Sequence, residues 1–350
     1  MLTTIISLLL QAGLLIGTFG DHSYTADYDL QTLEISNLQP FPAADAAFIC
    51  FDDKGGIFAV SEGDVPGACS YDAQHMLTGY SAEVGKSPCF IARIPGRPYV
   101  AVTSYGEGRI SVLGTQGGLI GPAVQQIRFR GHGPVLANDA QEHARAHSIR
   151  PIPDALGGEG KWMLSADLGS DRIRVLKVTG RADRPLRHCR WRDAKTPKGT
   201  GPRHMEFNEK SGLLYVIGEL SGEIIVYSVR GPRLRMVQHI QAEEVGAGAS
   251  ADIHLHPNGR WLYASHRNGN DGISIFEVGE DGLLTKIGYR HCGNHPRNFA
   301  IAPDGRSILV GCKNDKSLET YPLDPETGLI GDCASVINFA DDEPVCILFR

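Results

Sequence analysis

The sequence lacks the features of disulfide-rich and nucleic-acid-binding proteins. Its eight cysteines include no C-x-x-C pair, and along 350 residues they are too sparse for a disulfide scaffold and lack zinc-ligand spacing. Positive charge is in deficit, because 34 Lys and Arg stand against 40 Asp and Glu, for a formal net charge of -6. This balance argues against a general nucleic-acid or anionic-membrane surface. We expect reduced, mostly buried thiols.

Long apolar runs are absent beyond the N-terminus. The segment MLTTIISLLLQAGLLIGTFG has an apolar core, but no Lys or Arg precedes it and no A-x-A cleavage site follows. It is short for a membrane span and contains Gln11. Residues 14–20, LLIGTFG, can equally be a strand that enters the fold. We therefore expect a cytoplasmic protein without membrane contact, in which residues 1–12 are an extension or a weak signal-like segment; secretion is the alternative.

The motifs of common nucleotide, metal and hydrolase sites are missing as well. The chain has no G-x-S-x-G elbow, no P-loop and no H-E-x-x-H. A dinucleotide fingerprint would need a strand–helix alternation that this sequence does not show. The histidines are not spaced as zinc ligands on one helix or hairpin. We expect neither a cofactor nor a metal.

An internal repeat of short strands and turns runs through the chain instead. The 42 glycines and 20 prolines are dispersed, as expected for many turns. Residues 88–113, 202–229, 251–278 and 296–323 align, residues 147–178 fit with a longer turn, and residues 47–72 are a weaker copy. Each unit has an apolar strand, a turn such as PNGR or PDGR, an alternating strand, a polar turn and a further strand. The same point of the motif recurs in steps of 48, 46 and 47 residues at Met205, Ile253, Phe299 and Cys346.

This repeat predicts an all-β fold. Strands of period two between turns about every ten residues are typical of antiparallel sheets, and a period in the high forties matches propeller blades. Six units can be counted; EPVCILF (343–349) looks like one strand of another blade, and residues 14–35 supply the rest. We predict one domain, 1–350: a seven-bladed β-propeller of four-stranded antiparallel blades. Its ring would be closed by a blade shared between the N- and C-terminal strands, which removes open edges.

Polar residues recur at the blade positions that should face the central channel. At or near the start of the first strand of successive units stand Arg145 and His147, Arg203 and His204, Asp252 and His254, and Arg297. The second strand adds Asp167, Glu219 and Arg267. Because the repeat superimposes these positions, we expect the side chains to converge on one pocket.

Each of these residues also has a purely structural interpretation. A histidine in an alternating strand can be a satisfied core group, and an acid before a turn can accept bonds from backbone amides. Within GPRHMEFN (201–208), strict alternation turns His204 to the face opposite Arg203. We therefore expect Arg203 in the site and His204 in a packing or supporting role.

The blade sequences resemble a known family, the seven-bladed propeller lactonases, which include bacterial 6-phosphogluconolactonase and the fungal carboxy-cis,cis-muconate cyclases. The resemblance rests on GPRHMEFNEKSGLLYVIGELSGEIIVYSV, ADIHLHPNGRWLYASHRNGNDGISIFEV and PRNFAIAPDGRSILVG. It covers nearly the whole chain and is strongest from His147 to Gly328. The motifs P-R-H, E-L-S, A-D-I-H and P-R-x-F, in this order, carry it.

The resemblance implies a catalytic cluster in the channel. The family's proposed His, two Arg and Glu match His147 in AHS, Arg203 in PRH, Glu219 in GELS and Arg267 in SHRN. Where the family often has a first histidine in a P-H-x-H pattern, this chain has Arg145, which adds positive charge. We assign to substrate binding the remaining channel candidates, Arg145, Asp167, Asp252, His254 and Arg297.

Arginines that converge on a channel suit a substrate with a carboxylate or phosphate. The resemblance implies hydrolysis of a sugar-acid lactone, 6-phosphogluconolactone or a related aldonolactone, with Glu219 or His147 as the base. Two alternatives stay open: a cycloisomerase in which the same groups move a proton to carbon, and a non-catalytic binding platform. The expected partner is a small anionic lactone, without nucleic acid, and the expected assembly is a monomer or a weak homo-oligomer.

Overall fold

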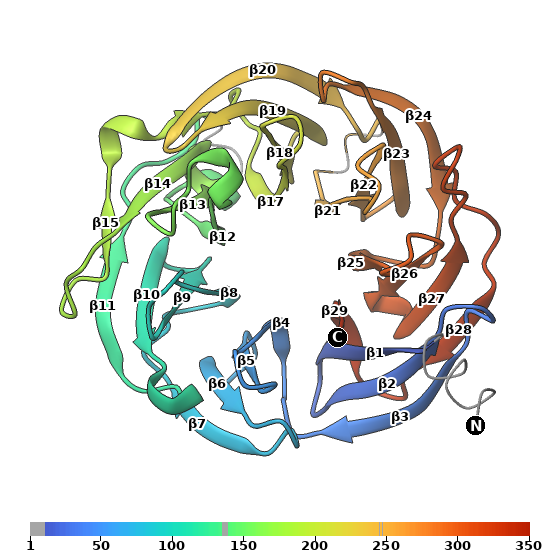
Figure 1. The fold of residues 1–350 in the computed structure, drawn as a ribbon, viewed down its shortest axis with the longest axis horizontal. Coiled ribbons are helices and arrows are strands. Elements are labelled where there is room, and N and C mark those ends of the chain that lie inside the picture. Colours follow the sequence, from blue (N-terminus) through green and yellow to red (C-terminus); the bar gives the residue numbers. More distant parts are fainter. Residues whose placement is uncertain (1–10, 135–138, 245, 247) are drawn as a thin grey trace.

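Seven antiparallel sheets form a ring around a central channel in the computed structural model, which describes residues 11–134, 139–244, 246 and 248–350 (Figure 1). In six sheets the strands follow one another in chain order from the channel outward. The first three of these are β4 (Ala46–Phe51), β5 (Ile57–Ser61), β6 (Gly67–Tyr71) and β7 (Leu77–Ser81); β8 (Pro88–Arg93), β9 (Tyr99–Ser104), β10 (Arg109–Gly114) and β11 (Ala123–Arg128); and β12 (Ala146–Pro151), β13 (Trp162–Asp167), β14 (Arg172–Val178) and β15 (Leu186–His188), with β16 (Ala194–Lys195) paired to β14. The next three are β17 (Pro202–Asn208), β18 (Leu213–Gly218), β19 (Glu223–Arg230) and β20 (Arg233–Gln241); β21 (Ser250–Leu255), β22 (Trp261–His266), β23 (Gly272–Val278) and β24 (Leu284–His291); and β25 (Pro296–Ile301), β26 (Ser307–Cys312), β27 (Ser317–Pro322) and β28 (Ser335–Asn338).

The seventh blade joins the two ends of the chain. Its order is β29 (Glu343–Phe349), β1 (Gln11–Phe19), β2 (Ser23–Asp29) and β3 (Ile35–Phe41), so a C-terminal strand lines the channel and N-terminal strands complete the sheet. Ile16 is paired with Ile347 in this ladder. The predicted fold class, blade count and shared closing blade are confirmed.

Residues that alternate along the second and third strands of neighbouring blades pack against one another to form the core. One such cluster joins Ile217 and Val226 to Leu262 and Phe276 of the next blade. Buried tyrosines connect blades as well: the Tyr215 hydroxyl donates to the Gly282 carbonyl at 2.7 Å. A buried phenol needs such a partner, because an unpaired hydroxyl in the core is costly.

The start of every inner strand departs from regular pairing. All seven inner strands show a register shift against the second strand within their first few residues. A bulge of this kind adds one residue and re-aims its side chain. His147, for example, lies between Ala146, paired with Asp167, and Ser148, paired with Ala166. The bulges therefore lie at one end of the channel, where the inner strands begin.

Helical structure is minor in the described part of the chain. It consists of the short 3-10 helices η1 (Gln116–Gly118), η2 (Asp139–Gln141), η3 (Asp154–Leu156), η4 (Leu168–Ser170), η5 (Arg190–Arg192) and η6 (Lys313–Asp315). Among these residues no helix is long and apolar enough to cross a membrane. All eight cysteines are free, and only Cys333 is exposed. Of the predicted N-terminal extension, residues 1–10 lie outside the described residues, and Gln11 begins β1.

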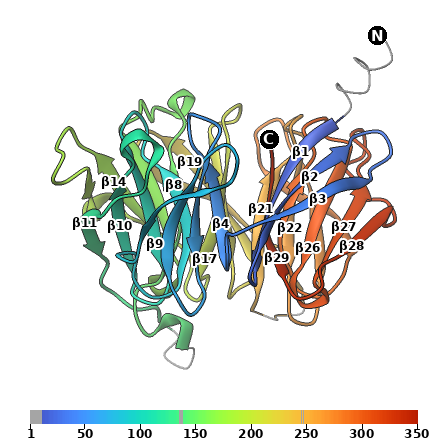
Figure 2. The same ribbon diagram turned by 90° about the horizontal axis from the view of Figure 1, so that it is seen from below.

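The inner strands run along the channel axis, as the side view in Figure 2 shows. They share one direction, so their first residues gather at one mouth of the channel and their last residues at the other. We call these the entry mouth and the far mouth. The C-terminal end of β29 lies at the far mouth (Figure 2).

Candidate active site in the central channel

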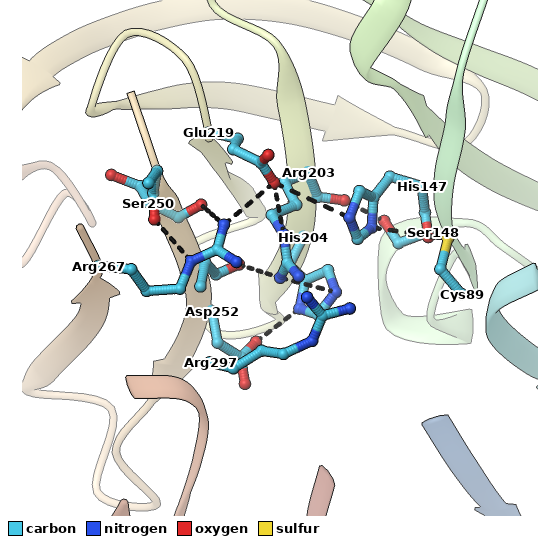
Figure 3. A network of polar contacts seen from close by, with 12 residues as sticks. Cys89, His147, Ser148, Arg203, His204, Glu219, Ser250, Asp252, Arg267 and Arg297 are labelled. Atoms are coloured by element: carbon cyan, nitrogen blue, oxygen red, sulfur yellow. Dashed lines mark hydrogen bonds and ion pairs between the residues drawn. The ribbon is translucent and has the colours of Figure 1, made fainter. Parts of the chain in front are cut away.

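One carboxylate oxygen at the entry mouth gathers three of the predicted site residues. Oε2 of Glu219 lies 2.7 Å from Nε of Arg203, 3.4 Å from Nη2 of Arg267 and 3.9 Å from Nε2 of His147 (Figure 3). Glu219 is partly exposed, whereas the other three are buried. The structure thus brings together the four residues that the sequence marked as catalytic.

The repeat explains how these side chains meet. Arg203 and His147 are the second residues of the inner strands β17 and β12, at the bulges. Glu219 and Arg267 directly follow the second strands β18 and β22, which run back toward the entry mouth. Each hairpin therefore delivers its side chains to one ring around the channel.

Backbone carbonyls in and just before β21 hold the two arginines. Nη1 of Arg203 donates to the Ala251 carbonyl at 2.6 Å, and Nε of Arg267 donates to the Ala249 carbonyl at 2.7 Å. Both guanidinium groups are therefore fixed before any ligand arrives. Pre-oriented donors of this kind cost little reorganisation when they stabilise a developing charge.

Burial and the surrounding charges set the protonation of the cluster. Burial, together with Arg203 and other cations, lowers the pKa of His147 well below its ordinary value, so its imidazole is neutral at neutral pH. Burial also lowers the pKa of Arg267 to about 9, with Glu219 opposing the shift. The arginine stays protonated at neutral pH.

Arg297 lies beside this cluster on the inner strand β25, two blades after β17 (Figure 3). Its Nη2 is 3.1 Å from Oε2 of Glu62, and its guanidinium covers the Phe19 ring at 4.9 Å. Burial raises the pKa of Glu62, and Arg297 opposes that shift. The entry mouth therefore holds a second carboxylate in a different environment from Glu219.

Two other predicted substrate-binding residues are engaged elsewhere. The carboxylate of Asp167 accepts bonds from Nε and Nη2 of Arg174 at 2.9 and 2.7 Å, and from the hydroxyl of Ser170. Arg145 covers the Tyr105 ring at 4.7 Å and donates to the Asp139 carbonyl. Asp167 is fully buried in its own blade, so the structure does not bring its carboxylate to Glu219.

Asp252 and His254 form a separate group deeper in the channel. Oδ1 of Asp252 lies 2.7 Å from Nδ1 of His204, and Oδ2 lies 2.9 Å from Nε2 of His254. Asn298 also donates to this carboxylate. Burial lowers the pKa of His254, but the Asp252 carboxylate outweighs it and the net pKa is raised. These residues belong to a hydrogen-bonded group next to the cluster.

His204 corrects a prediction. Alternation was expected to turn it away from Arg203, yet Nη1 of Arg203 lies 3.3 Å from its Nε2 (Figure 3). The bulge between Pro202 and Met205 breaks the period of two, which is why the two neighbours lie together. Burial lowers the pKa of His204 to about 4, so the ring is neutral. Its Nδ1–H then donates to Asp252 while Nε2 accepts from Arg203.

Sequence reasoning missed Glu62 and His295. Glu62 directly follows β5 in SEG, the position that Glu219 occupies in GEL, so the weaker copy of the repeat carried the signal. His295 precedes β25, and its Nε2 lies 3.4 Å from Nη1 of Arg267. Burial, with Arg267 next in effect, lowers the pKa of His295 to about 3, so this ring is also neutral.

Among the described residues, Glu219 belongs to no group of His, Cys, Asp or Glu side chains that could hold a metal ion together. One group has suitable atoms within 4.8 Å of one another: Cys292, Cys312 and Glu319, between the last two blades of the chain. Oε2 of Glu319 already accepts from the Gly293 amide at 2.9 Å and from the Tyr321 hydroxyl. The chemistry of the channel cluster is that of arginines, histidine and a carboxylate.

Comparison with known proteins agrees with the fold. A family model described as "Lactonase, 7-bladed beta-propeller" matches residues 14–349. The chain belongs to this family. A 6-phosphogluconolactonase of Formosa agariphila is 32% identical over 250 residues, which cover 70% of this chain and 69% of that protein. The 6-phosphogluconolactonase of Bacillus subtilis is 27% identical over 310 residues, with 85% and 81% covered.

Solved structures of similar proteins superpose on nearly the whole chain. A candidate 6-phosphogluconolactonase of Bacteroides fragilis superposes with a TM-score of 0.89 at 31% identity and covers 97% of this chain and 98% of its own. The periplasmic gluconolactonase PpgL of Pseudomonas aeruginosa gives a TM-score of 0.88 at 25% identity, with 97% and 99% covered. The protein is therefore an enzyme of the lactonase class.

Proposed function

We propose that the protein hydrolyses the ring of an anionic sugar-acid lactone at the cluster of His147, Arg203, Glu219 and Arg267. The observation that carries this proposal is the convergence of two buried arginines and one neutral imidazole on a single carboxylate oxygen. Ester hydrolysis needs a base for water and donors for the oxyanion, and this set supplies both kinds of group.

His147 is the proposed base. Its neutral imidazole can accept a proton from water, which a protonated ring cannot do. The imidazolium that results lies 3.9 Å from Glu219, whose negative charge stabilises it. Oε2 of Glu219 already contacts both arginines, so this carboxylate serves as their charged partner. We therefore assign the proton transfer to His147 and the support of the charged intermediate to Glu219.

Arg203 and Arg267 are the proposed donors to the substrate. Both are buried and held by backbone carbonyls, so their charge acts in a region with little solvent screening. Attack of water on the lactone carbonyl places negative charge on its oxygen, and a guanidinium N–H can stabilise that charge. Collapse of the intermediate then breaks the ring C–O bond, and the imidazolium of His147 returns its proton to the leaving alkoxide, which gives the hydroxy acid.

The charge balance of the entry mouth favours an anionic substrate. Arg203, Arg267 and Arg297 stand against the carboxylates of Glu219 and Glu62, while His147 is neutral. Even with both carboxylates ionised, the group has a surplus of positive charge. Relatives named 6-phosphogluconolactonase support the phosphorylated lactone as substrate. Arg297 is the proposed phosphate partner, and Arg145 would add positive charge nearby.

The test is a substrate panel with the purified protein. 6-Phosphogluconolactone, glucono-1,5-lactone and carboxymuconate are supplied separately, and acid release or ultraviolet absorbance is followed with spontaneous hydrolysis subtracted. The proposal predicts turnover of the lactones, fastest for the phosphorylated one. Conversion of carboxymuconate without lactone hydrolysis would favour the cycloisomerase, and no turnover of any compound would favour a binding platform.

A further inference from the structure

A second cavity lies in the channel on the side of His204 that faces the far mouth. Its volume is about 390 Å³, and residues of all seven inner strands line it. The lining includes Phe51, Pro151 and Leu348, at the ends of inner strands, so the cavity extends toward the face where these strands end (Figure 2). Neither Glu219 nor Arg267 is part of this lining. The cavity is therefore separate from the catalytic cluster.

Three rings form the boundary between the two parts of the channel. The rings of Phe48 and Phe90 are stacked with centroids 3.8 Å apart, and the ring of His204 meets them edge-on at 6.0 and 5.6 Å. All three residues line the cavity, while His204 also accepts from Arg203 of the cluster. A ligand in the cavity would touch these rings without reaching Glu219.

The cavity has the composition of a small-molecule site. Its lining is mostly apolar and includes Phe48, Phe51, Phe90, Ile149, Ile347 and Leu348. Its volume falls in the range of about 300 to 1,000 Å³ that is common for ligand pockets, which are typically apolar with a few placed polar groups. Phe48 is only half-buried, so one stacked ring offers surface to an aromatic ligand.

The polar lining consists of Arg93, Arg150, His204, Asp252, His254 and Asn298. Arg150 lies on β12 and His254 on β21, the inner strands on either side of β17. The side chains of Arg150 and His254 line the cavity, and each is 36% exposed. Nη1 of Arg150 binds Glu206 and the Met205 carbonyl, and Nε2 of His254 binds Asp252. In the part of the chain that the structure describes, Nε and Nη2 of Arg150 and Nδ1 of His254 have no hydrogen-bond partner. Arg150 therefore keeps donors for a further acceptor, and Nδ1 of His254 is a donor when the ring carries both protons, the state that the Asp252 carboxylate favours.

We propose that this cavity binds a small aromatic carboxylate, whose ring contacts Phe48 and Phe90 and whose carboxylate accepts bonds from Arg150 and His254. Charge-assisted bonds from Arg150, and from His254 when its ring is protonated, favour a carboxylate over a neutral acceptor. The aromatic and aliphatic walls favour a ring over a short aliphatic acid. The site is distinct from the proposed lactone site, so the inference does not depend on which lactone the enzyme opens.

Calorimetry on the intact wild-type protein tests the proposal with three probes. Benzoate has both the ring and the carboxylate, benzyl alcohol has only the ring, and acetate has only the carboxylate. We expect benzoate to bind at least about tenfold more tightly than either partial probe, since a bond to a charged group and the burial of a ring each contribute about that factor. Absence of benzoate binding, or equal affinity for benzyl alcohol, would overturn the proposal.

Variants locate the bound probe. Arg150→Gln and His254→Gln should each weaken benzoate binding about tenfold. Two matched controls should leave it unchanged: His239→Gln, an exposed histidine paired with Glu223, and Arg297→Met at the entry mouth. Loss of benzoate binding in Arg297→Met but not in His254→Gln would place the probe in the catalytic cluster and contradict the inference. Thermal unfolding shows whether each variant is folded. If one is not, the affinities of the wild-type protein for benzoate, benzyl alcohol and acetate test the proposal without it.

Discussion

Oε2 of Glu219 lies 2.7 Å from Nε of Arg203, although the two residues are separated by a whole hairpin of the same blade. Arg203 is the second residue of the inner strand, at its bulge, and Glu219 directly follows the return strand. The same carboxylate oxygen also faces Arg267 of the next blade. One carboxylate therefore holds two buried cations at the channel mouth, and loss of its charge would leave both without that partner.

Arg297 should discriminate between phosphorylated and unphosphorylated lactones. Arg297→Met removes a guanidinium whose ion-pair partner among the described residues is Glu62. We expect KM for 6-phosphogluconolactone to rise about tenfold or more, as for loss of a charged hydrogen bond, with little change in KM for glucono-1,5-lactone.

Steady-state kinetics on both substrates make this measurement. Arg290→Met is the control, because Arg290 lies on the outer strand β24, away from the channel, and pairs with Asp332. An equal rise in KM for both lactones would show that Arg297 does not recognise the phosphate.

Asp167 should matter for stability and not for substrate affinity. Asp167→Asn keeps the shape of the side chain but removes the charge that two nitrogens of Arg174 contact. Breaking a buried ion pair on one side typically costs about 3–5 kcal/mol, so we expect a loss of that order in the free energy of unfolding.

Urea unfolding gives the free energy, and lactone kinetics give KM. The exposed pair of Asp183 and Arg181 offers the control, since Asp183→Asn should leave the free energy of unfolding nearly unchanged. A large rise in KM for Asp167→Asn, without destabilisation, would assign this residue to the substrate after all.

Stability should fall when the buried histidines are forced to take up protons. Burial lowers the pKa of His204 to about 4 and that of His266 to about 3, and it lowers the pKa of His147 well below its ordinary value. In the unfolded chain these rings titrate near pH 6.5, so below that pH the unfolded state binds more protons than the folded state. Their contribution is complete above about pH 6.5 and is lost as the pH falls toward 4.

Urea midpoints between pH 7.5 and pH 4.5 test this dependence. His254 has the opposite sign, because its raised pKa favours the folded state at lower pH, but His295, whose pKa is also lowered, adds to the effect of the other three. We expect the midpoint to decrease steadily below about pH 6.5. A midpoint that stays constant down to pH 4.5 would mean that these histidines take up protons at the same pH in the folded protein as in the unfolded chain.

The repeat made most of the fold predictable. Strands of period two and a step near 47 residues determine the blades, and EPVCILF could be matched to an inner strand because it repeats the same motif. The convergence of Arg203, Glu219 and Arg267 followed from their equivalent places in successive blades. Positions that a repeat superimposes come together regardless of their distance in sequence.

The roles of a few channel residues could not be predicted from the sequence, because they depend on local geometry. The bulge after Pro202 turns His204 into the channel, and strict alternation cannot reveal it. Asp167 occupies a site-like position, but Arg174, seven residues later on the facing strand, captures its carboxylate. Glu62 stands in the most divergent copy of the repeat, where the alignment was weakest. In each case one side-chain contact decides the role.

The most direct test of the account is lactone turnover by Glu219→Gln and His147→Gln beside the wild type. Glutamine preserves the size of the glutamate and removes its charge, and Glu223→Gln, at a partly exposed pair, is the control. We expect kcat for 6-phosphogluconolactone to fall roughly a hundredfold or more in each site variant, the usual range for loss of a general base or of charge stabilisation, with the protein still folded. Undiminished turnover in both variants would contradict the assignment of the channel cluster as the active site.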